Sequence, residues 1–142
     1  MKVTFKRLDL ELPPPERARE GDAGFDLRTS TDLTLGPGER VAAPTGLAIA
    51  FPVGHAALVL PRSGLAARHG LGIVNSPGLI DSGYRGEIKV LLINHGAEEV
   101  FLERGERIAQ LVFVGLPDVI WSESETLPDS HRGEGGFGSS GT

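Results

Sequence analysis

The sequence predicts an all-β fold, an antiparallel sandwich or barrel with one short helix. Short apolar runs recur along its 142 residues, and glycine or proline residues separate them. This spacing is typical of strands joined by tight turns, and the 20 glycines and 10 prolines suffice for the many turns of such a fold. Because 39% of the residues are hydrophobic, the chain can bury one core of ordinary size, and we expect a single domain.

The apolar runs give the positions of the expected strands. A short strand is expected at Leu79 and Ile80, before a polar turn. The single helix is predicted to begin at Ser63, as its N-cap, and to end near His69 because Gly70 follows. Residues 122–131 are polar and are expected to be extended. The other strands are expected at residues 3–8, 24–29, 41–43, 47–51, 56–60, 88–93, 108–114 and 119–121.

The composition excludes several classes of protein. The chain has no cysteine, which rules out disulfides and thiolate zinc sites, and its four histidines show no paired metal spacing. Any metal is therefore expected to have oxygen ligands. No apolar run approaches about 20 residues and no signal peptide precedes the first strand, so we expect a soluble, cytoplasmic protein without a membrane partner.

The charged residues favour a small phosphorylated ligand. A net charge of -5 disfavours a nucleic-acid partner, because binding to a phosphate backbone requires a broad basic surface. A small ligand requires only a few arginines. Most of the positive charge is indeed arginine, since lysine occurs only at positions 2, 6 and 89, and the planar guanidinium suits bidentate contacts with phosphate.

Residues 78–88, GLIDSGYRGEI, set one carboxylate and one aromatic hydroxyl around a forced turn. Asp81 and Tyr84 flank Ser82 and Gly83. Because strands are expected on both sides, these polar residues are predicted to form a hairpin tip that faces solvent or a ligand. Two interpretations of Asp81 stay open: it braces its own turn, or it serves a ligand site.

Three further residue groups suit a phosphorylated ligand or its metal. Arg62, Ser63 and Gly64, in PRSGLA, stand at the start of the predicted helix, where free N–H groups attract anions, although Ser63 could simply cap the helix. Asp26 is either a strand-end turn residue or a residue that holds magnesium through water. Gln110, in GERIAQL, is either an exposed strand residue or a phosphate donor.

The C-terminal segment, residues 132–141, reads RGEGGFGSSG. Its composition is typical of a disordered tail. Its residues also have the parts of a nucleotide clamp, because backbone N–H groups and the hydroxyls of Ser139 and Ser140 can hold phosphate oxygens while Phe137 stacks on a base. Both interpretations hold for a lid that is mobile when empty and ordered over a bound nucleotide.

Taken together and in order, these segments resemble the motifs of the homotrimeric dUTPase family, the deoxyuridine triphosphate pyrophosphatases. Any one motif is a weak signal, whereas five with compatible spacing across nearly the whole chain are highly specific. The resembling segments are AGFDL at residues 23–27, PRSGLA at 61–66, NSPGLIDSGYRGEI at 75–88, GERIAQL at 105–111 and RGEGGFGSSG at 132–141.

The resemblance implies hydrolysis of dUTP to dUMP and pyrophosphate, which would keep uracil out of DNA and supply dUMP for thymidylate synthesis. Asp81 would be the general base that orients a water for in-line attack on the α-phosphate. Tyr84 would lie against the deoxyribose, so that a ribose 2′-OH clashes. Recognition of the uracil edge would involve Asn75 and main-chain groups near Leu79, Ile80 and Lys89.

The resemblance also implies how the triphosphate is held. Magnesium would arrive with the substrate, and Asp26 would reach it through water. Phe137 would stack on uracil. The phosphates would be held by Arg62, Ser63, Gly64, Gln110, Arg132, Gly138, Ser139 and Ser140.

The implied architecture is a β-sandwich or jelly-roll-like barrel that assembles as a homotrimer. Residues 1–121 would form the barrel, and residues 122–142 would form a flexible arm of the same domain that closes an active site on a neighbouring subunit. The spacer at residues 122–131 is long enough, since ten extended residues span up to ~35 Å.

Two alternatives remain. A dCTP deaminase shares this fold, but it requires a catalytic glutamate and ordinarily lacks a Gly-Phe-Gly tail of this kind. A nucleotide-gated binding or regulatory module is the second alternative. Asp81 argues against a purely non-catalytic role, because a binding protein has no need of a positioned base.

Overall fold

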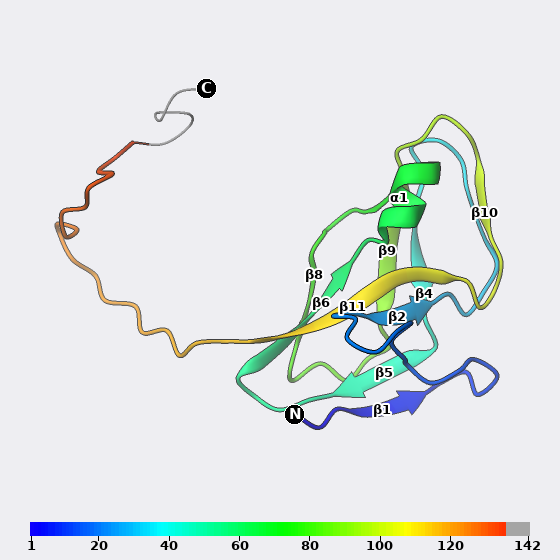
Figure 1. Cartoon of the computed structure of the whole chain (residues 1–142), viewed down its shortest axis with the longest axis horizontal. Coiled ribbons are helices and arrows are strands. Elements are labelled where there is room, and N and C mark those ends of the chain that lie inside the picture. The colour runs from blue at the N-terminus through cyan, green and yellow to red at the C-terminus, as the bar shows by residue number, and fades with distance from the viewer. Residues whose placement is uncertain (136–142) are drawn as a thin grey trace.

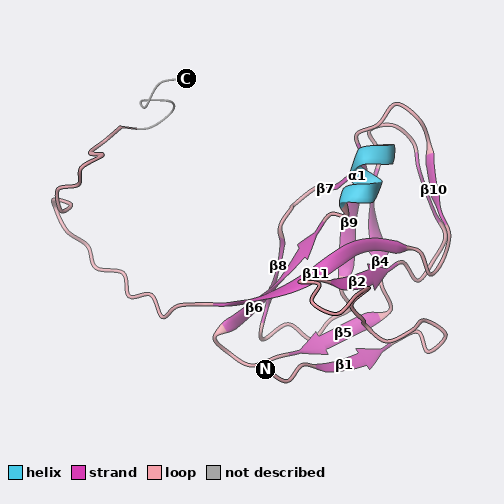
Figure 2. Ribbon diagram, in the orientation of Figure 1, coloured by secondary structure: helices cyan, strands magenta, loops and turns pink. Residues whose placement is uncertain are grey.

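Eleven strands and one seven-residue helix make up the described part of the chain, which is residues 1–135 of a computed structural model (Figure 1). The fold is nearly all-β, as the sequence predicts, and Figure 2 shows the helix packed at one end of the strands. The elements are β1 (Thr4–Arg7), β2 (Phe25–Arg28), β3 (Leu33–Leu35), β4 (Arg40–Pro44), β5 (Leu47–Ala50), β6 (His55–Leu60), α1 (Ser63–His69), β7 (Leu71–Ile73), β8 (Gly78–Asp81), β9 (Lys89–Asn94), β10 (Val100–Leu102) and β11 (Arg107–Gly115).

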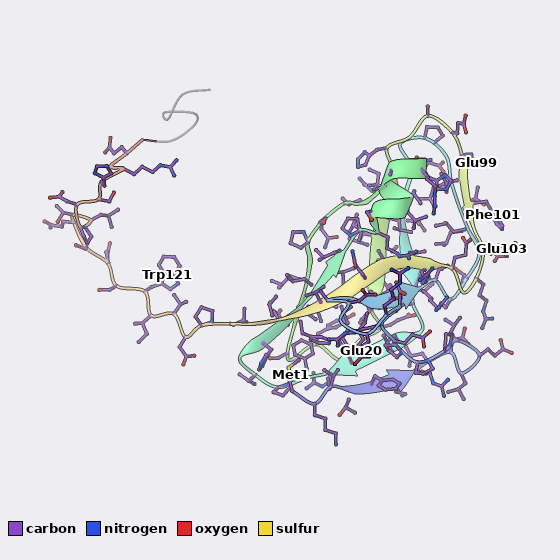
Figure 3. All side chains as sticks on the ribbon, in the orientation of Figure 1. Met1, Glu20, Glu99, Phe101, Glu103 and Trp121 are labelled. Carbon is purple, nitrogen blue, oxygen red and sulfur yellow. The ribbon has the colours of Figure 1, made fainter. Side chains whose placement is uncertain are left out.

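Most of the expected strands are confirmed, with ends that shift by one or two residues. Three short strands, β3, β7 and β10, were not expected, because three residues are too few to show a clear alternation. The strand expected at residues 119–121 is wrong. Ile120 and Trp121 are 93% and 94% exposed, and Trp121 lies on the extended segment that leaves the strands (Figure 3). Because no strand of the described residues lies beside it to pair with, this apolar run stays irregular.

The strands of residues 1–135 form four sheets, and β6 is the strand that organises the largest of them. That sheet has the order β2-β11-β6-β8, and the others are β4-β9-β7, β1-β5 and β10-β3. On one side of β6, Ala56 pairs with Asp81 of β8. On the other side, Leu60 pairs with Gln110 of β11. The two ends of β6 therefore carry two different parts of the predicted site.

The core lies between the inward faces of these sheets. In β9, Val90 and Leu92 are buried whereas Lys89 and Leu91 are exposed, which is the alternation expected when one face of a strand covers a core. Each such buried aliphatic side chain stabilises the fold by about 1.5–3 kcal/mol. The largest fully buried apolar side chains are Leu27, Leu35, Ile88, Leu92, Ile108 and Val90.

The hairpin predicted between the strands at residues 79–80 and 88–93 is wrong. Both strands exist, as β8 and β9, but β8 pairs with β6 while β9 pairs with β4 and β7. Ile88 is the cause: it is buried, and its N–H donates to the carbonyl of Leu47, 2.8 Å away. The connecting residues therefore cross from one sheet to another, and the two strands separate.

The predicted helix at Ser63–His69 is confirmed, with one correction at its start. Arg62 rather than Ser63 is the N-cap residue, since its backbone is extended (φ -94°, ψ 124°), and no side-chain capping hydrogen bond is present there. Gly70 ends the helix in the left-handed conformation, as predicted. No helix among residues 1–135 is long and apolar enough to cross a membrane.

Two glycines with similar backbones provide a test of this packing. Gly38 and Gly70 have φ of 77° and 67°, but an added Cβ meets nothing within 4 Å at Gly38, whereas at Gly70 it would lie 2.7 Å from the backbone nitrogen of Gly96. Gly38→Ala should cost about 1 kcal/mol from backbone strain alone. Gly70→Ala should cost at least about 3 kcal/mol, because backbone atoms must also move. Urea unfolding at one protein concentration measures both, and equal losses would contradict the close approach at Gly70.

Candidate active site

The first candidate cavity lies where β8 and β9 separate, and it contains the residues predicted to read a base. Its volume is about 240 Å³. Among residues 1–135, the edge of β8 that faces away from β6 has no partner strand, and β9 pairs with β7 only from Leu92 onward. Two strand edges with unpaired stretches therefore line one slot. Such edges offer N–H and C=O groups to a planar ligand. Among the predicted residues, the slot is lined by Asn75, Leu79, Ile80, Asp81, Tyr84 and Lys89.

Asp81 stands at the rim of this cavity, at the end of β8. The turn after it is closed by the N–H of Tyr84, which donates to the Asp81 carbonyl at 3.0 Å. Arg85 braces the same turn by donating to the carbonyls of Ser82 and Tyr84, at 2.6 and 2.8 Å. Within residues 1–135 the Asp81 carboxylate accepts no hydrogen bond and forms no ion pair. The turn is therefore held without this carboxylate, which argues against the interpretation that Asp81 only braces it.

Tyr84 is the only tyrosine of the chain, and contacts within its own turn hold its ring in place. The hydroxyl donates to the carbonyl of Glu87 at 2.9 Å. The ring lies over Gly86, where an added Cβ would collide with the hydroxyl oxygen and would lie 2.6 Å from Cζ. Gly86 therefore lets the ring stand beside the cavity rather than swing into solvent. Sequence reasoning did not identify Gly86, although it lies within the 75–88 segment.

A second cavity, of about 290 Å³, contains the residues predicted to hold phosphate. It is lined by Asp26 of β2, by Arg62, Ser63 and Gly64 at the junction of β6 and α1, and by Gln110 of β11. Gln110 is thus at the cavity, where its Nε2 donates to the Pro61 carbonyl at 2.9 Å. These strands are neighbours in one sheet, which explains why residues far apart in sequence meet here.

Asp26 is the centre of charge in this second cavity. Its side chain is 12% exposed, with Oδ1 3.5 Å from Nε of Arg62 and Oδ2 3.3 Å from Nη1 of Arg107. Arg62 also donates to the Arg107 carbonyl at 3.1 Å. Burial lowers the pKa of Arg62, as does the charge of Arg107 to a lesser degree, while Asp26 acts in the opposite direction. Asp26 therefore orients two guanidinium groups.

Arg107 is a member of this cluster that sequence reasoning missed. A signal was present, since Arg107 lies inside GERIAQL at residues 105–111. Strand pairing places Arg107 of β11 opposite Arg28 of β2, and the Arg107 side chain reaches Asp26, also on β2, 3.3 Å away. This contact between two strands is not visible in the sequence.

The donor groups near Asp26 bear on the predicted magnesium. Residues 1–135 contain no group of three or more His, Cys, Asp or Glu side chains that could hold a metal ion. Both oxygens of Asp26 already face arginines. This arrangement does not make a protein cage, so a hard cation at Asp26 would have to bring most of its oxygen ligands with it and be reached through water.

The two cavities are separated within one chain. Asp81 pairs with Ala56, and Gln110 pairs with Leu60, four residues further along β6. At about 3.3 Å per residue this offset is about 13 Å. No residue of the described part of the chain lines both cavities. The structure thus brings the predicted residues together as two groups and not as one.

The predicted C-terminal residues lie elsewhere. Arg132 is exposed, and its Nε donates to the Gly135 carbonyl at 2.7 Å. The segment that follows β11 extends away from the strands (Figure 1). Arg132 reaches neither cavity. The remaining predicted residues of this segment, Phe137, Gly138, Ser139 and Ser140, lie outside the described residues.

A nearly all-β fold with one cavity that contains Arg62 and Asp26, and with a slot between strand edges, is an arrangement that suits a phosphorylated ligand with a planar part. The sequence model of the dUTPase family matches residues 11–141. The chain belongs to the dUTPase family.

Individual relatives agree with this assignment. The deoxyuridine 5'-triphosphate nucleotidohydrolases of Thermobifida fusca and Corynebacterium glutamicum are each 56% identical to this chain, over 99% and 98% of it and over 79% and 94% of their own lengths. The solved structure of the Staphylococcus bacteriophage 80alpha dUTPase with dUPNHPP is similar at a TM-score of 0.92, with 30% identity and 99% of both chains covered. These relatives do not favour the dCTP deaminase alternative.

The position of the Tyr84 ring can be tested by substituting two glycines of the same turn. Gly86→Ala should displace the ring, because the new Cβ collides with it, whereas Gly83→Ala should not, because nothing lies within 4 Å of its Cβ position. Since Tyr84 is the only tyrosine, its ring proton signals can be assigned directly in an NMR spectrum. We expect these signals to shift in Gly86→Ala and to stay unchanged in Gly83→Ala. Unchanged signals in both variants would show that the ring does not rest on Gly86.

Proposed function

We propose that this chain hydrolyses dUTP to dUMP and pyrophosphate. The observation that carries the proposal is the Asp81 carboxylate, which has no partner within residues 1–135 and stands at the rim of a slot between two strand edges. A carboxylate that is not used to hold its turn is available to a water molecule. The family membership and the names of the relatives support the same activity.

In the proposed mechanism, Asp81 acts as a general base. It accepts a proton from a water that attacks the α-phosphorus in line with the leaving group. A new bond forms between the water oxygen and the α-phosphorus, and the bond from this phosphorus to the α,β-bridging oxygen breaks. The β- and γ-phosphates leave together as pyrophosphate, and no covalent intermediate with the protein is required.

The slot supports selection of the base and the sugar. Asn75 and the backbone edges near Leu79, Ile80 and Lys89 would pair with uracil, and a base with a different edge would leave these groups unpaired. Tyr84 would pack against the deoxyribose, where its ring, held in place by Glu87 and Gly86, leaves no room for a 2′-hydroxyl. Selection of dUTP over UTP is then a consequence of shape.

The second cavity supports binding of the triphosphate. Arg62, Ser63, Gly64 and Gln110 would contact its oxygens, and Arg132 and Gly138 to Ser140 would complete the contacts while Phe137 stacks on uracil. Mg²⁺ bound to the triphosphate would offset part of its negative charge. Asp26 would hold that ion through water while it orients Arg62 and Arg107.

A homotrimer completes the site in this proposal. One chain carries Asp81 and Arg62 in cavities that no described residue shares, and this separation supports a site in which a cavity of one subunit faces a cavity of another. Residues 1–121 form the body of each subunit, and residues 122–142 form an arm that reaches a neighbour. The exposed Ile120 and Trp121, just before the arm, support packing against another copy. A cytoplasmic location is part of the same proposal.

Replacing the base tests the mechanism. Asp81→Asn retains the shape of the side chain and removes the proton acceptor, so we expect the fold and nucleotide affinity to persist while kcat falls at least ~10²-fold. Asp118→Asn, at an exposed position beyond β11, is the matched control and should retain full turnover. Steady-state release of pyrophosphate from dUTP measures the effect. Near-normal kcat in an intact oligomer of Asp81→Asn would exclude Asp81 as the base.

Mixed trimers test the exchanged arm. A chain that ends at Thr126 keeps Asp81 and loses the arm, whereas full-length Asp81→Asn keeps the arm and loses the base, so each should be nearly inactive alone. When the two are unfolded and reassembled together at equal amounts, arms that cross between subunits should restore activity at roughly a quarter of the sites. Native mass spectrometry confirms that mixed trimers form. Mixed trimers without activity would show that each arm serves its own subunit.

A further inference from the structure

A third cavity, strongly basic, adjoins the proposed phosphate site. Its volume is about 520 Å³, and it lies between α1, β10 and the start of β11. Arg62 lines both this cavity and the one that contains Ser63 and Gly64, so the two cavities adjoin at its side chain. Its polar lining includes the arginines Arg28, Arg62, Arg68, Arg104 and Arg107, together with His69 and a single carboxylate, Glu106.

Four of these arginines have partners within the chain. Arg62 and Arg107 share Asp26. Arg104 binds Asp9 and Glu11 with its Nη2, at 2.6 and 2.9 Å. Arg28, on β2, donates to the Gly105 carbonyl at 2.8 Å and lies 3.8 Å from Glu16.

Arg68 differs from the other four arginines. No salt bridge or side-chain hydrogen bond within residues 1–135 involves it. An ordinary solvated surface arginine can also lack a partner, so its place in the fold decides its role. Arg68 lies in the last turn of α1 and lines the basic cavity instead of pointing away from it.

The position of Arg68 relative to Gly64 links it to the phosphate site. Side chains four residues apart lie on the same face of a helix and point towards its start. Accordingly, Nη2 of Arg68 lies 3.5 Å from the place where a Cβ on Gly64 would stand. Gly64 itself lines the second cavity, beside Ser63. The guanidinium of Arg68 therefore stands at the boundary between the two cavities.

The charges around this boundary favour a ligand with several negative charges. Burial lowers the pKa of Arg62, and the charges of Arg107, Arg28 and Arg68 add to this effect, with only Asp26 opposing them. Like charges held together in a partly buried place repel each other unless an anion joins them. In a bound nucleoside triphosphate, the β- and γ-phosphates carry most of the negative charge and lie furthest from the base.

We propose that Arg68 is a further substrate-binding residue, whose guanidinium contacts the β- and γ-phosphates of the bound nucleotide. The inference rests on the proposed function, since these two phosphates are the unit that leaves as pyrophosphate. A guanidinium at this place holds the terminal phosphates of a triphosphate and has nothing to hold in a monophosphate. Arg68 thereby favours dUTP over dUMP at the same site.

Inorganic pyrophosphate and dUMP are the two probes that separate this role from a general structural one. Arg68→Gln in the full-length chain should weaken binding of pyrophosphate about tenfold, the scale expected for losing a hydrogen bond between charged groups. The same variant should bind dUMP as the unmodified chain does. Arg68→Lys retains the charge without the planar guanidinium, so its pyrophosphate affinity should lie between those of the unmodified chain and Arg68→Gln. Arg40→Gln removes one charge from an exposed position in β4 and is the matched control.

Isothermal titration calorimetry measures these affinities without turnover, so its outcome is independent of the proposed hydrolysis. Unchanged pyrophosphate affinity in Arg68→Gln, or an equal loss for pyrophosphate and dUMP, would overturn the inference. A tenfold loss for pyrophosphate alone supports it. Were the unmodified chain to leave dUTP intact in a turnover assay, the proposed function would fail, while the calorimetric result would still decide whether Arg68 holds the two phosphates.

Discussion

The register of β6 between its two neighbours is the constraint on which both cavities depend. Backbone hydrogen bonds fix Ala56 opposite Asp81 on one side and Leu60 opposite Gln110 on the other. A slip of one residue would turn every side chain of a strand to the opposite face and would move Ala57 and Val59 of β6 out of the core cluster, so their burial fixes this register. The slot beside Asp81 and the cavity beside Gln110 are thus held at a set distance by the sheet itself.

Asp26 positions the charged groups of the second cavity, as β6 positions the strands around it. Two guanidinium groups approach one carboxylate that is largely buried, which lets them stand close together before any phosphate is bound. Ion pairs of partly exposed groups contribute little to stability, so the main effect of Asp26 is on orientation. On the proposed function, a triphosphate would meet arginines that are already arranged, and less side-chain freedom would be lost when it binds.

The sequence predicted the elements of this fold better than their partners. Apolar runs of four or more residues identified β6, β9 and β11, because a buried strand needs such a run. The pairing of β8 with β9 was wrong, since nearness along the chain suggested a hairpin while the buried Ile88 directs β9 to other neighbours. A local pattern reports whether a segment is a strand, whereas pairing depends on which long-range contacts bury the most surface.

The same distinction holds for the site, where residue types were predictable and their grouping was not. The motifs named Asp81 and Arg62 as parts of one reaction, yet one chain places them in separate cavities. A sequence motif indicates which residues a reaction requires, but it does not indicate which subunit of an oligomer supplies each residue. On the proposed function, an isolated subunit has one cavity for the uracil ring and another for the phosphates of a nucleotide. Contact between subunits is then what brings two such cavities together as one active site.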